Sequence, residues 1–143
     1  MLVVKNEVEI DAAPERVWAI LADFESYPEW NTLAPSMKGS LVPGELLRGR
    51  LGLGSRLKVP FFPRLVTAEP NSELRWAGGV PGVLVADHRF LLEAIPGGGT
   101  RVSHHEEFSG LMPAVGRGVT EQVTNRLHSR FNGALKRRAE STV

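Results

Sequence analysis

The first residues of the chain alternate between apolar and charged side chains. Val4, Val8 and Ile10 take every second or fourth position, with lysine and glutamates between them. This period of two predicts a strand with one buried face. A helix is expected to follow from Pro14, because proline suits the first turn of a helix. Its apolar residues have helical spacing: Val17, Ile20, Leu21 and Phe24. A break and a second short helical turn are expected between residues 23 and 31.

The middle of the chain, residues 36–109, has no helical period and holds most of the glycines and prolines. This composition predicts strands joined by turns. The expected strands lie near residues 36–42, 45–52, 55–68, 73–78, 82–95 and 100–109. The expected turns are Pro43-Gly44, Gly52-Leu53-Gly54, Pro70-Asn71-Ser72, Gly79-Val80-Pro81-Gly82 and Pro96-Gly97-Gly98-Gly99. Pro60 and Pro63 cannot both lie in a central strand, so a loop or bulge is expected within 55–68.

The clearest hairpin joins the last two strands through Pro96 and the three glycines that follow it. It is expected to bring Phe90 or Leu92 beside Val102 or His104.

Beyond Met112 the apolar residues recur every four positions, with arginines and glutamate between them. The residues of this stripe are Val115, Val119, Val123, Leu127, Phe131 and Leu135. The pattern predicts an amphipathic helix of roughly 25 residues. Because the stripe drifts around the helix axis, we expect the helix to lie curled inside a sheet. The order of strand, two short helices, about six strands and a long helix predicts an α+β fold in a single domain, residues 1–143.

Composition narrows the class of protein. The chain has 143 residues, of which 42% are hydrophobic and 23% charged, as in a globular domain with a real core. The formal net charge is +1, and the one dense basic run, Lys136-Arg137-Arg138, fits the end of a helix. No nucleic-acid partner is therefore expected.

The chain contains no cysteine, so disulfides, thiolate metal sites and a cysteine nucleophile are excluded. Acidic residues follow too soon after Met1 for a signal peptide, and no apolar run is long enough for a transmembrane segment. We expect a cytoplasmic protein that is a monomer or a homodimer.

Seven segments of this sequence resemble the START-like superfamily, and within it the polyketide cyclase/dehydrase and lipid-transport group. They are VEIDAAPERVW (8–18), DFESYPEWN (23–31), LRW (74–76), DHRF (87–90), GTRVSH (99–104), FSG (108–110) and FNGALKRRAE (131–140). The resemblance implies a helix-grip fold, in which a seven-stranded antiparallel sheet wraps around the long C-terminal helix and encloses a cavity. Members bind lipids, hormones, polyketides or other apolar molecules, and some are enzymes. A shared fold does not decide among these functions.

Alternation predicts which side chains of the last two strands point inward. His88 shares a face with Phe90 and Leu92. His104 and Glu106 share a face with Val102 and Phe108. These three polar residues therefore lie on apolar faces, where they need partners.

Three interpretations of this polar group remain open. His88, His104 and Glu106 hydrogen-bond within the fold, anchor a ligand, or act as catalytic acid and base. Burial disfavours a charged imidazole, whereas a nearby Glu106 favours it, so the sequence does not fix the protonation state. The expected ligand-binding residues are Trp30, Asn31, Trp76, His88, Phe90, Leu92, His104, Glu106, Phe108, Val123 and Leu127.

The leading function hypothesis is binding or carriage of a small apolar ligand, such as a lipid, a quinone or a polyketide-like molecule. The first alternative is an aromatase/cyclase or dehydrase that uses the same polar residues, with Asn31 or an inward-facing arginine as a further hydrogen-bond donor. The second is a protein-interaction module. No cofactor is expected. No metal is expected either, since His104 and His105 point to opposite faces and no HExxH motif is present.

Overall fold

The computed structural model describes residues 1–53 and 56–141. The predicted order of elements is confirmed, and the described residues form eight strands in place of the expected seven. The elements are β1 (Leu2–Ile10), α1 (Pro14–Ala22), a 3-10 helix (Phe24–Ser26), α2 (Tyr27–Trp30), β2 (Ser36–Lys38), β3 (Arg48–Gly52), β4 (Lys58–Phe61), β5 (Arg64–Glu69), β6 (Glu73–Val80), β7 (Leu84–Ala94), β8 (Thr100–Ser109), α3 (Leu111–Val115) and α4 (Arg117–Glu140). Within the described residues, no helix is both long and apolar enough to cross a membrane.

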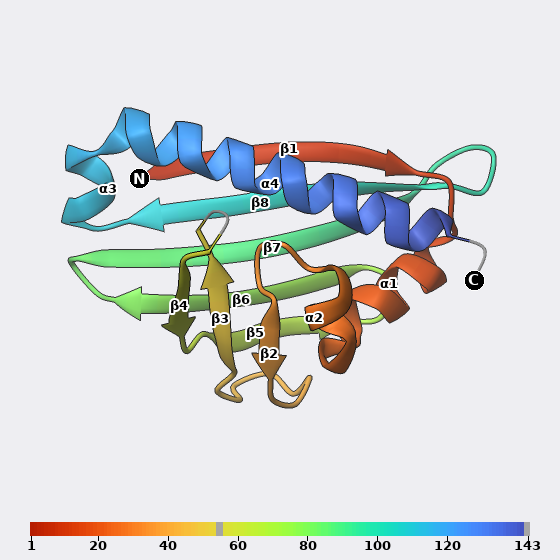
Figure 1. Cartoon of the computed structure of the whole chain (residues 1–143), viewed down its shortest axis with the longest axis horizontal. Coiled ribbons are helices and arrows are strands. Elements are labelled where there is room, and N and C mark those ends of the chain that lie inside the picture. Colours follow the sequence, from red (N-terminus) through yellow and green to blue (C-terminus); the bar gives the residue numbers. More distant parts are fainter. Residues whose placement is uncertain (54–55, 142–143) are drawn as a thin grey trace.

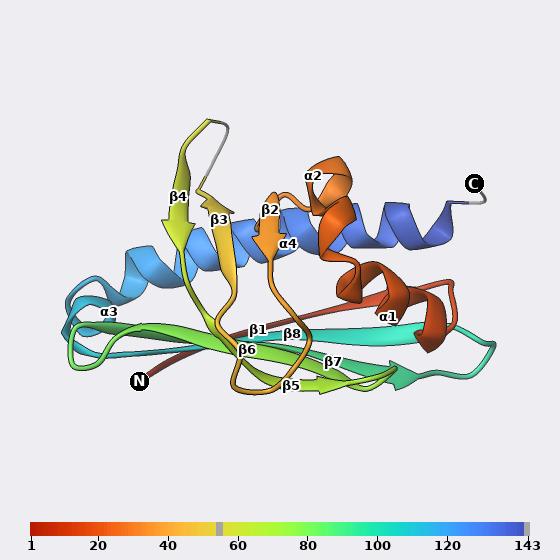
Figure 2. The ribbon, with the colours of Figure 1, turned by 90° about the horizontal axis from the view of Figure 1, so that it is seen from below.

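The strands form two antiparallel sheets. The larger sheet has the order β1-β8-β7-β6-β5, and the smaller has the order β2-β3-β4. Helix α4 crosses one face of the larger sheet along β1 and β8 (Figure 1). The smaller sheet stands on the same side as α4 (Figure 2). The face of the larger sheet that α4 and the small sheet cover is called the inner face below.

The expectation of one seven-stranded sheet is wrong, because the segment predicted as a single strand, 55–68, contributes to two sheets. It divides at Phe62-Pro63 into β4, which pairs with β3, and β5, which pairs with β6. Pro60 lies in β4, at the edge of the small sheet, where a missing N–H is tolerated. Residue 55 and Gly54 of the predicted turn lie outside the described residues. The predicted strands 36–42 and 45–52 are shorter than expected, as β2 and β3.

The hairpin between β7 and β8 is confirmed in both turn and register. Gly97 and Gly98 have φ of 94° and 88°, a region that glycine adopts without steric cost. Phe90 pairs with His104, and Leu92 pairs with Val102. The side chains that alternation placed inward therefore do share the inner face.

The core lies between the inner face and the helices. Val17 and Leu21 of α1 are fully buried, as the helical spacing predicted. They pack with residues of every layer: Ile10, Phe24, Tyr27, Met37, Leu47, Leu65, Leu74, Phe90, Leu92, Val102, Phe131 and Leu135. This core fills the end of the molecule where α1 and the C-terminal half of α4 meet the sheet.

The predicted apolar stripe of the long helix is only half right. Val115 lies in α3, and Val119 and Val123 lie on α4, yet all three are exposed. The reason is geometric: each step of four residues turns about 40° around an α-helix, so the stripe leaves the buried face. The buried residues of α4 follow another line: Thr124, His128, Phe131, Asn132, Ala134, Leu135 and Ala139.

Leu127 lies where the two lines cross and is half-buried. We expect Leu127→Ala to cost less than the roughly 2–5 kcal/mol of a fully buried leucine, because part of its surface already faces solvent. Chemical denaturation of the two proteins measures the difference. A cost within that range would mean that Leu127 is packed as tightly as the core.

Candidate functional site

Strand pairing aligns the inner-face residues in rows across β6, β7, β8 and β1. The first row is Leu74, Phe90, His104 and Asn6. The second is Trp76, His88, Glu106 and Val4. The third is Gly78, Ala86, Phe108 and Leu2. Directly paired residues of antiparallel strands share a face, so each row is a line of neighbouring side chains.

The first row belongs to the packed core. Phe90 and His104 are fully buried, and Phe131 of α4 stacks on Phe90 with ring centroids 5.1 Å apart. Phe131 also contacts His104 at 5.0 Å between ring centroids. This row therefore has little space for a ligand.

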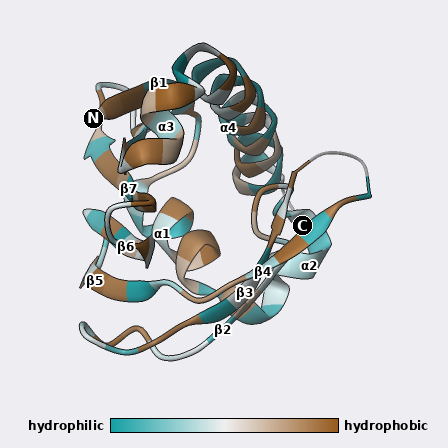
Figure 3. Ribbon diagram, turned by 90° about the vertical axis from the view of Figure 1, so that its left-hand side faces the viewer, coloured by the Kyte–Doolittle hydropathy of each residue, from teal (hydrophilic) through white to brown (hydrophobic). Residues whose placement is uncertain are grey.

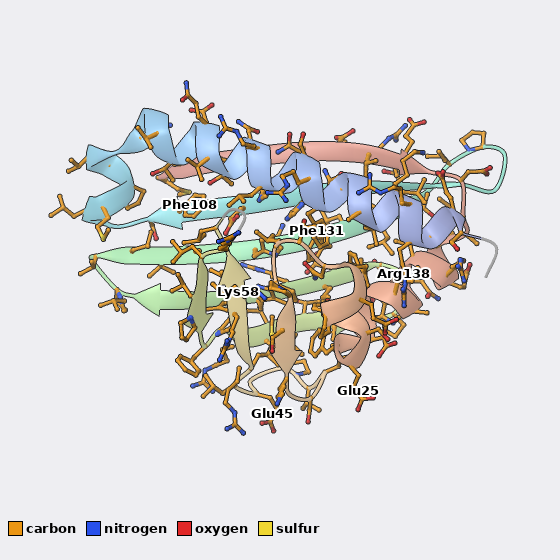
Figure 4. The ribbon with its side chains drawn as sticks, viewed as in Figure 1. Glu25, Glu45, Lys58, Phe108, Phe131 and Arg138 are labelled. Carbon is orange, nitrogen blue, oxygen red and sulfur yellow. The ribbon has the colours of Figure 1, made fainter. Side chains whose placement is uncertain are left out.

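The third row is different, because three of its four residues are only partly covered, whereas Leu2 is buried. Gly78, Ala86 and Phe108 are all half-buried, although they lie on the inner face. In Figure 4, Phe108 of the third row lies towards the end of β8. Phe131, which packs on the first row, lies near the middle of α4, away from Phe108.

Helix α4 and the small sheet, which cover the inner face, also leave apolar surface partly uncovered. Leu127 of α4 and Phe61 of β4 border the core and are half-buried. Leu51 is half-buried and lies on the same face of the small sheet as Phe61. In the view from this end, α4 and the small sheet both stand over the inner face, α4 near the β1 edge of the large sheet and the small sheet near the β5 edge (Figure 3). The half-buried residues Gly78, Ala86, Phe108, Leu127, Phe61 and Leu51 are called the open apolar end.

The second row separates the core from the open apolar end and carries His88 and Glu106, and His104 of the first row lies beside them. His88 is 4% exposed and His104 0%, so both imidazoles point inward as predicted. Their Nε2 atoms lie 2.6 Å apart, and Nδ1 of His104 lies 3.1 Å from Oδ1 of Asn132. Trp76 stacks on His88 with an interplanar angle of 13°.

These contacts define the tautomers of the pair. Oδ1 of Asn132 only accepts, so Nδ1 of His104 carries the hydrogen. Nε2 of His104 then accepts from Nε2–H of His88. Nδ1 of His88 remains a buried lone pair without a hydrogen-bond partner among the described residues.

A second polar chain begins on α4. His128 is fully buried, and its Nε2 lies 2.9 Å from Oε1 of Glu106. Its Nδ1 lies 3.3 Å from Nδ2 of Asn6, which also donates to Oδ1 of Asn125 at 3.0 Å. An amide nitrogen only donates, so Nδ1 of His128 accepts and Nε2–H donates to the carboxylate. Glu106 is thus hydrogen-bonded to His128 of α4 and not to His88 or His104. Alternation along the strands predicts that Glu106 points inward but does not predict its partner.

Burial decides the protonation of the strand histidines. It lowers the pKa of His88 to about 4, against a smaller raising effect of Glu106. It also lowers the pKa of His104 well below the ordinary value, and the neighbouring His88 and His128 act in the same direction. Both imidazoles are therefore neutral near pH 7, in agreement with their tautomers.

The three histidines are close enough to be considered as metal ligands, since one nitrogen of each lies within 4.8 Å of the others. The ring geometry does not fit one ion. His104 and His128 stack 3.6 Å apart at 11°, so their in-plane lone pairs cannot meet at a single point. The bonded Nε2 atoms of His88 and His104 would also have to separate to admit an ion at about 2.0–2.1 Å from each.

Other predicted ligand residues lie in the core or at its border. Phe90 and Leu92 are buried, and Trp30 is half-buried against Phe131, with ring centroids 5.4 Å apart. Oδ1 of Asn31 accepts from the backbone N–H of Leu33 and Ala34, so Asn31 stabilises the turn after α2. Val123 is exposed on α4. The structure therefore gathers Trp76, His88, Glu106, Phe108 and Leu127 near the open apolar end, and places the others elsewhere.

The polar partners His128, Asn132 and Asn6 were not predicted from the sequence. The available signal was the helical spacing of Thr124, His128, Asn132 and Leu135, which places polar and apolar residues on one face of α4.

The structure also has two open surface depressions of about 640 Å³ each. One lies beside β5 and β6, includes the outward-facing Ala77 and Val85, and is also lined by Leu46, Phe62, Val66 and Gly78, among others. The other lies between α1 and the end of α4, near Arg16, Trp30 and Arg138.

Comparison with known families identifies the family of the chain. The model of the family described as "Polyketide cyclase / dehydrase and lipid transport" matches residues 1–140. The chain belongs to this family. Among curated proteins, none matches the sequence significantly.

Several solved structures share this helix-grip fold. A START superfamily protein from Mycobacterium smegmatis has 19% identity and a TM-score of 0.78, with 96% of this chain and 97% of that chain covered. The Zhui aromatase/cyclase from Streptomyces sp. R1128 has 15% identity and a TM-score of 0.78, with 96% and 93% covered. A protein of Thermus thermophilus has 18% identity and a TM-score of 0.75, with 96% of each chain covered. At these identities the likeness concerns the fold alone.

Proposed function

We propose that this member of the polyketide cyclase/dehydrase and lipid-transport family binds and carries a small apolar ligand at the open apolar end. The observation that carries the proposal is the contrast between neighbouring rows of one sheet face. The row of Phe90 and His104 is sealed, whereas the row of Ala86 and Phe108 leaves apolar atoms accessible on an inner face.

The driving force would be burial of these apolar atoms. Each Å² removed from water contributes about 25 cal/mol, so a ligand that covers Ala86, Phe108, Leu127 and Phe61 is stabilised without any new ion pair. Lipids, quinones and polyketide-like molecules all fit this description. We propose that the protein acts as a monomer or homodimer in the cytoplasm, as one domain, without a cofactor or nucleic acid.

A pair of adjacent substitutions on opposite faces of β7 tests the site. Ala86→Phe adds a ring to the open apolar end, and we expect it to weaken binding of naphthalene at least about tenfold by occupying the space. Val85→Phe adds the same ring to the depression beside β5 and β6 and should leave the affinity unchanged. Isothermal titration calorimetry measures both.

Ala86→Leu serves as a milder variant if Ala86→Phe does not fold, and circular dichroism monitors folding. Loss of binding in Val85→Phe with retention in folded Ala86→Phe or Ala86→Leu would place the ligand on the outer face and contradict the proposal.

An aromatase/cyclase or dehydrase activity is the second candidate, favoured by the contact between His88 and His104 beside the same apolar surface. A general base works best when its pKa lies near the operating pH. Burial lowers the pKa of His88 to about 4, which makes it a weak base at neutral pH and favours carriage. Release of water from a bound poly-β-ketone, detected by mass spectrometry and lost in His88→Phe, would decide for the enzyme.

A further inference from the structure

The second row, which borders the open apolar end, contains two groups that accept hydrogen bonds, Glu106 and Nδ1 of His88. Glu106 presents a carboxylate, and its side chain keeps 15% of its surface exposed. Nδ1 of His88, in the same row, is a lone pair without a partner in the described part of the chain. Both atoms belong to the row that separates the core from the open apolar end.

The surrounding contacts hold this polarity in place. Asn132 fixes the hydrogen of His104 on Nδ1, and His104 in turn draws the hydrogen of His88 to Nε2. Asn6 fixes the hydrogen of His128 on Nε2, where it points at Glu106. The ring N–H groups of His88 and His128 are therefore already used inside the protein.

We infer that the open apolar end selects apolar molecules that present a hydroxyl group to Glu106, and discriminates against their carboxylate analogues. The inference rests on the proposed function and adds the chemical class of the ligand. A hydroxyl donates to a carboxylate in a charge-assisted hydrogen bond, which is stronger than a neutral one. A ligand carboxylate meets the like charge of Glu106 and finds no free donor at His88 or His128.

Ligands with the same apolar surface should then differ in affinity according to their polar group. A fatty acid and a fatty alcohol of equal length cover the same apolar surface, as do an aromatic acid and a phenol. We expect only the alcohol and the phenol to gain affinity from a hydrogen bond to Glu106. A desolvated like-charge contact opposes the acids.

Three probes of one ring system test the selectivity: naphthalene, 2-naphthol and 2-naphthoic acid, titrated calorimetrically into the full chain at neutral pH. We expect 2-naphthol to bind about tenfold tighter than naphthalene, and 2-naphthoate to bind more weakly than naphthalene, from the usual strength of one hydrogen bond to a charged group. Tighter binding of 2-naphthoate than of 2-naphthol by the wild-type protein would overturn the inference.

Glu106→Gln probes the anchor itself with almost no change in shape. His128 Nε2–H would bond the amide oxygen of the glutamine and leave its NH₂ facing the ligand. We therefore expect the preference to reverse, with 2-naphthoate gaining about tenfold and 2-naphthol losing a similar factor. Glu107→Gln is the matched control, because the neighbouring glutamate points to the outer face and should leave the preference unchanged.

The outcomes separate the two proposals. If no probe binds, or if binding of naphthalene survives in folded Ala86→Phe, the proposed function fails. If naphthalene binds and Ala86→Phe blocks it, but Glu106→Gln leaves the ratio of 2-naphthol to 2-naphthoate affinity as in the wild type, only the inferred selectivity fails.

Discussion

Phe131→Ala is expected to destabilise the protein by roughly 3–5 kcal/mol, the range for a large aromatic side chain removed from a core. Phe131 is 1% exposed and contacts three aromatic rings: Trp30 from α2, Phe90 from β7 and His104 from β8. No single neighbour can fill the space, because each is held by its own strand or helix. The free energy of unfolding in urea, measured by circular dichroism, gives the cost.

Val119→Ala on the same helix is the control for a change in helix propensity. Val119 is 69% exposed, and a surface substitution of this kind changes stability by no more than about 0.5 kcal/mol. If Phe131→Ala lowers the free energy of unfolding by no more than Val119→Ala does, α4 does not pack against the first row as described.

Acid is expected to destabilise the protein between pH values of about 6.5 and about 4, because His88 must stay neutral in the fold. Burial lowers its pKa from 6.5 to about 4, so within this window the unfolded chain binds a proton that the folded chain does not. Stability is therefore complete above the upper value and is lost as the pH falls towards the lower one. The contribution of His88 is on the order of 3 kcal/mol, and His104 acts in the same direction.

The measurement is a series of urea unfolding curves across this pH range for the wild type and His88→Phe. The phenyl ring keeps the stack on Trp76 and removes the titrating group, so we expect a shallower loss of stability with falling pH. His105→Gln, a change on the outer face, is the matched histidine control and should keep the wild-type slope. Equal slopes in wild type and His88→Phe would mean that the imidazole is not held neutral by burial.

Local patterns were sufficient to predict most of the fold. The alternation along β7 and β8 predicts correctly that His88 and His104 point inward, because the side chains of a strand alternate with a fixed period of two. Glycines 97 to 99 set the hairpin, and the turn then determined the register. These features depend on neighbours along the chain, so the sequence contains them.

Features that depend on tertiary contacts could not be predicted in this way. The bond between Glu106 and His128 joins β8 to α4, and nothing in either segment alone indicates that partner. The four-residue spacing of valines suggested a buried stripe, yet the face of α4 is chosen by what packs against it, and Val119 and Val123 lie outside. The division of 55–68 between two sheets likewise depends on which strands are available to pair with β4 and β5.

We propose that a small apolar ligand binds on the inner face, at the open apolar end. Intermolecular NOEs between the aromatic protons of 2-naphthol and the methyl groups of the protein test it most directly. We expect NOEs to Ala86 and Leu127, which belong to that end. NOEs confined to Val66, Ala77 and Val85, which line the depression beside β5 and β6, would contradict it.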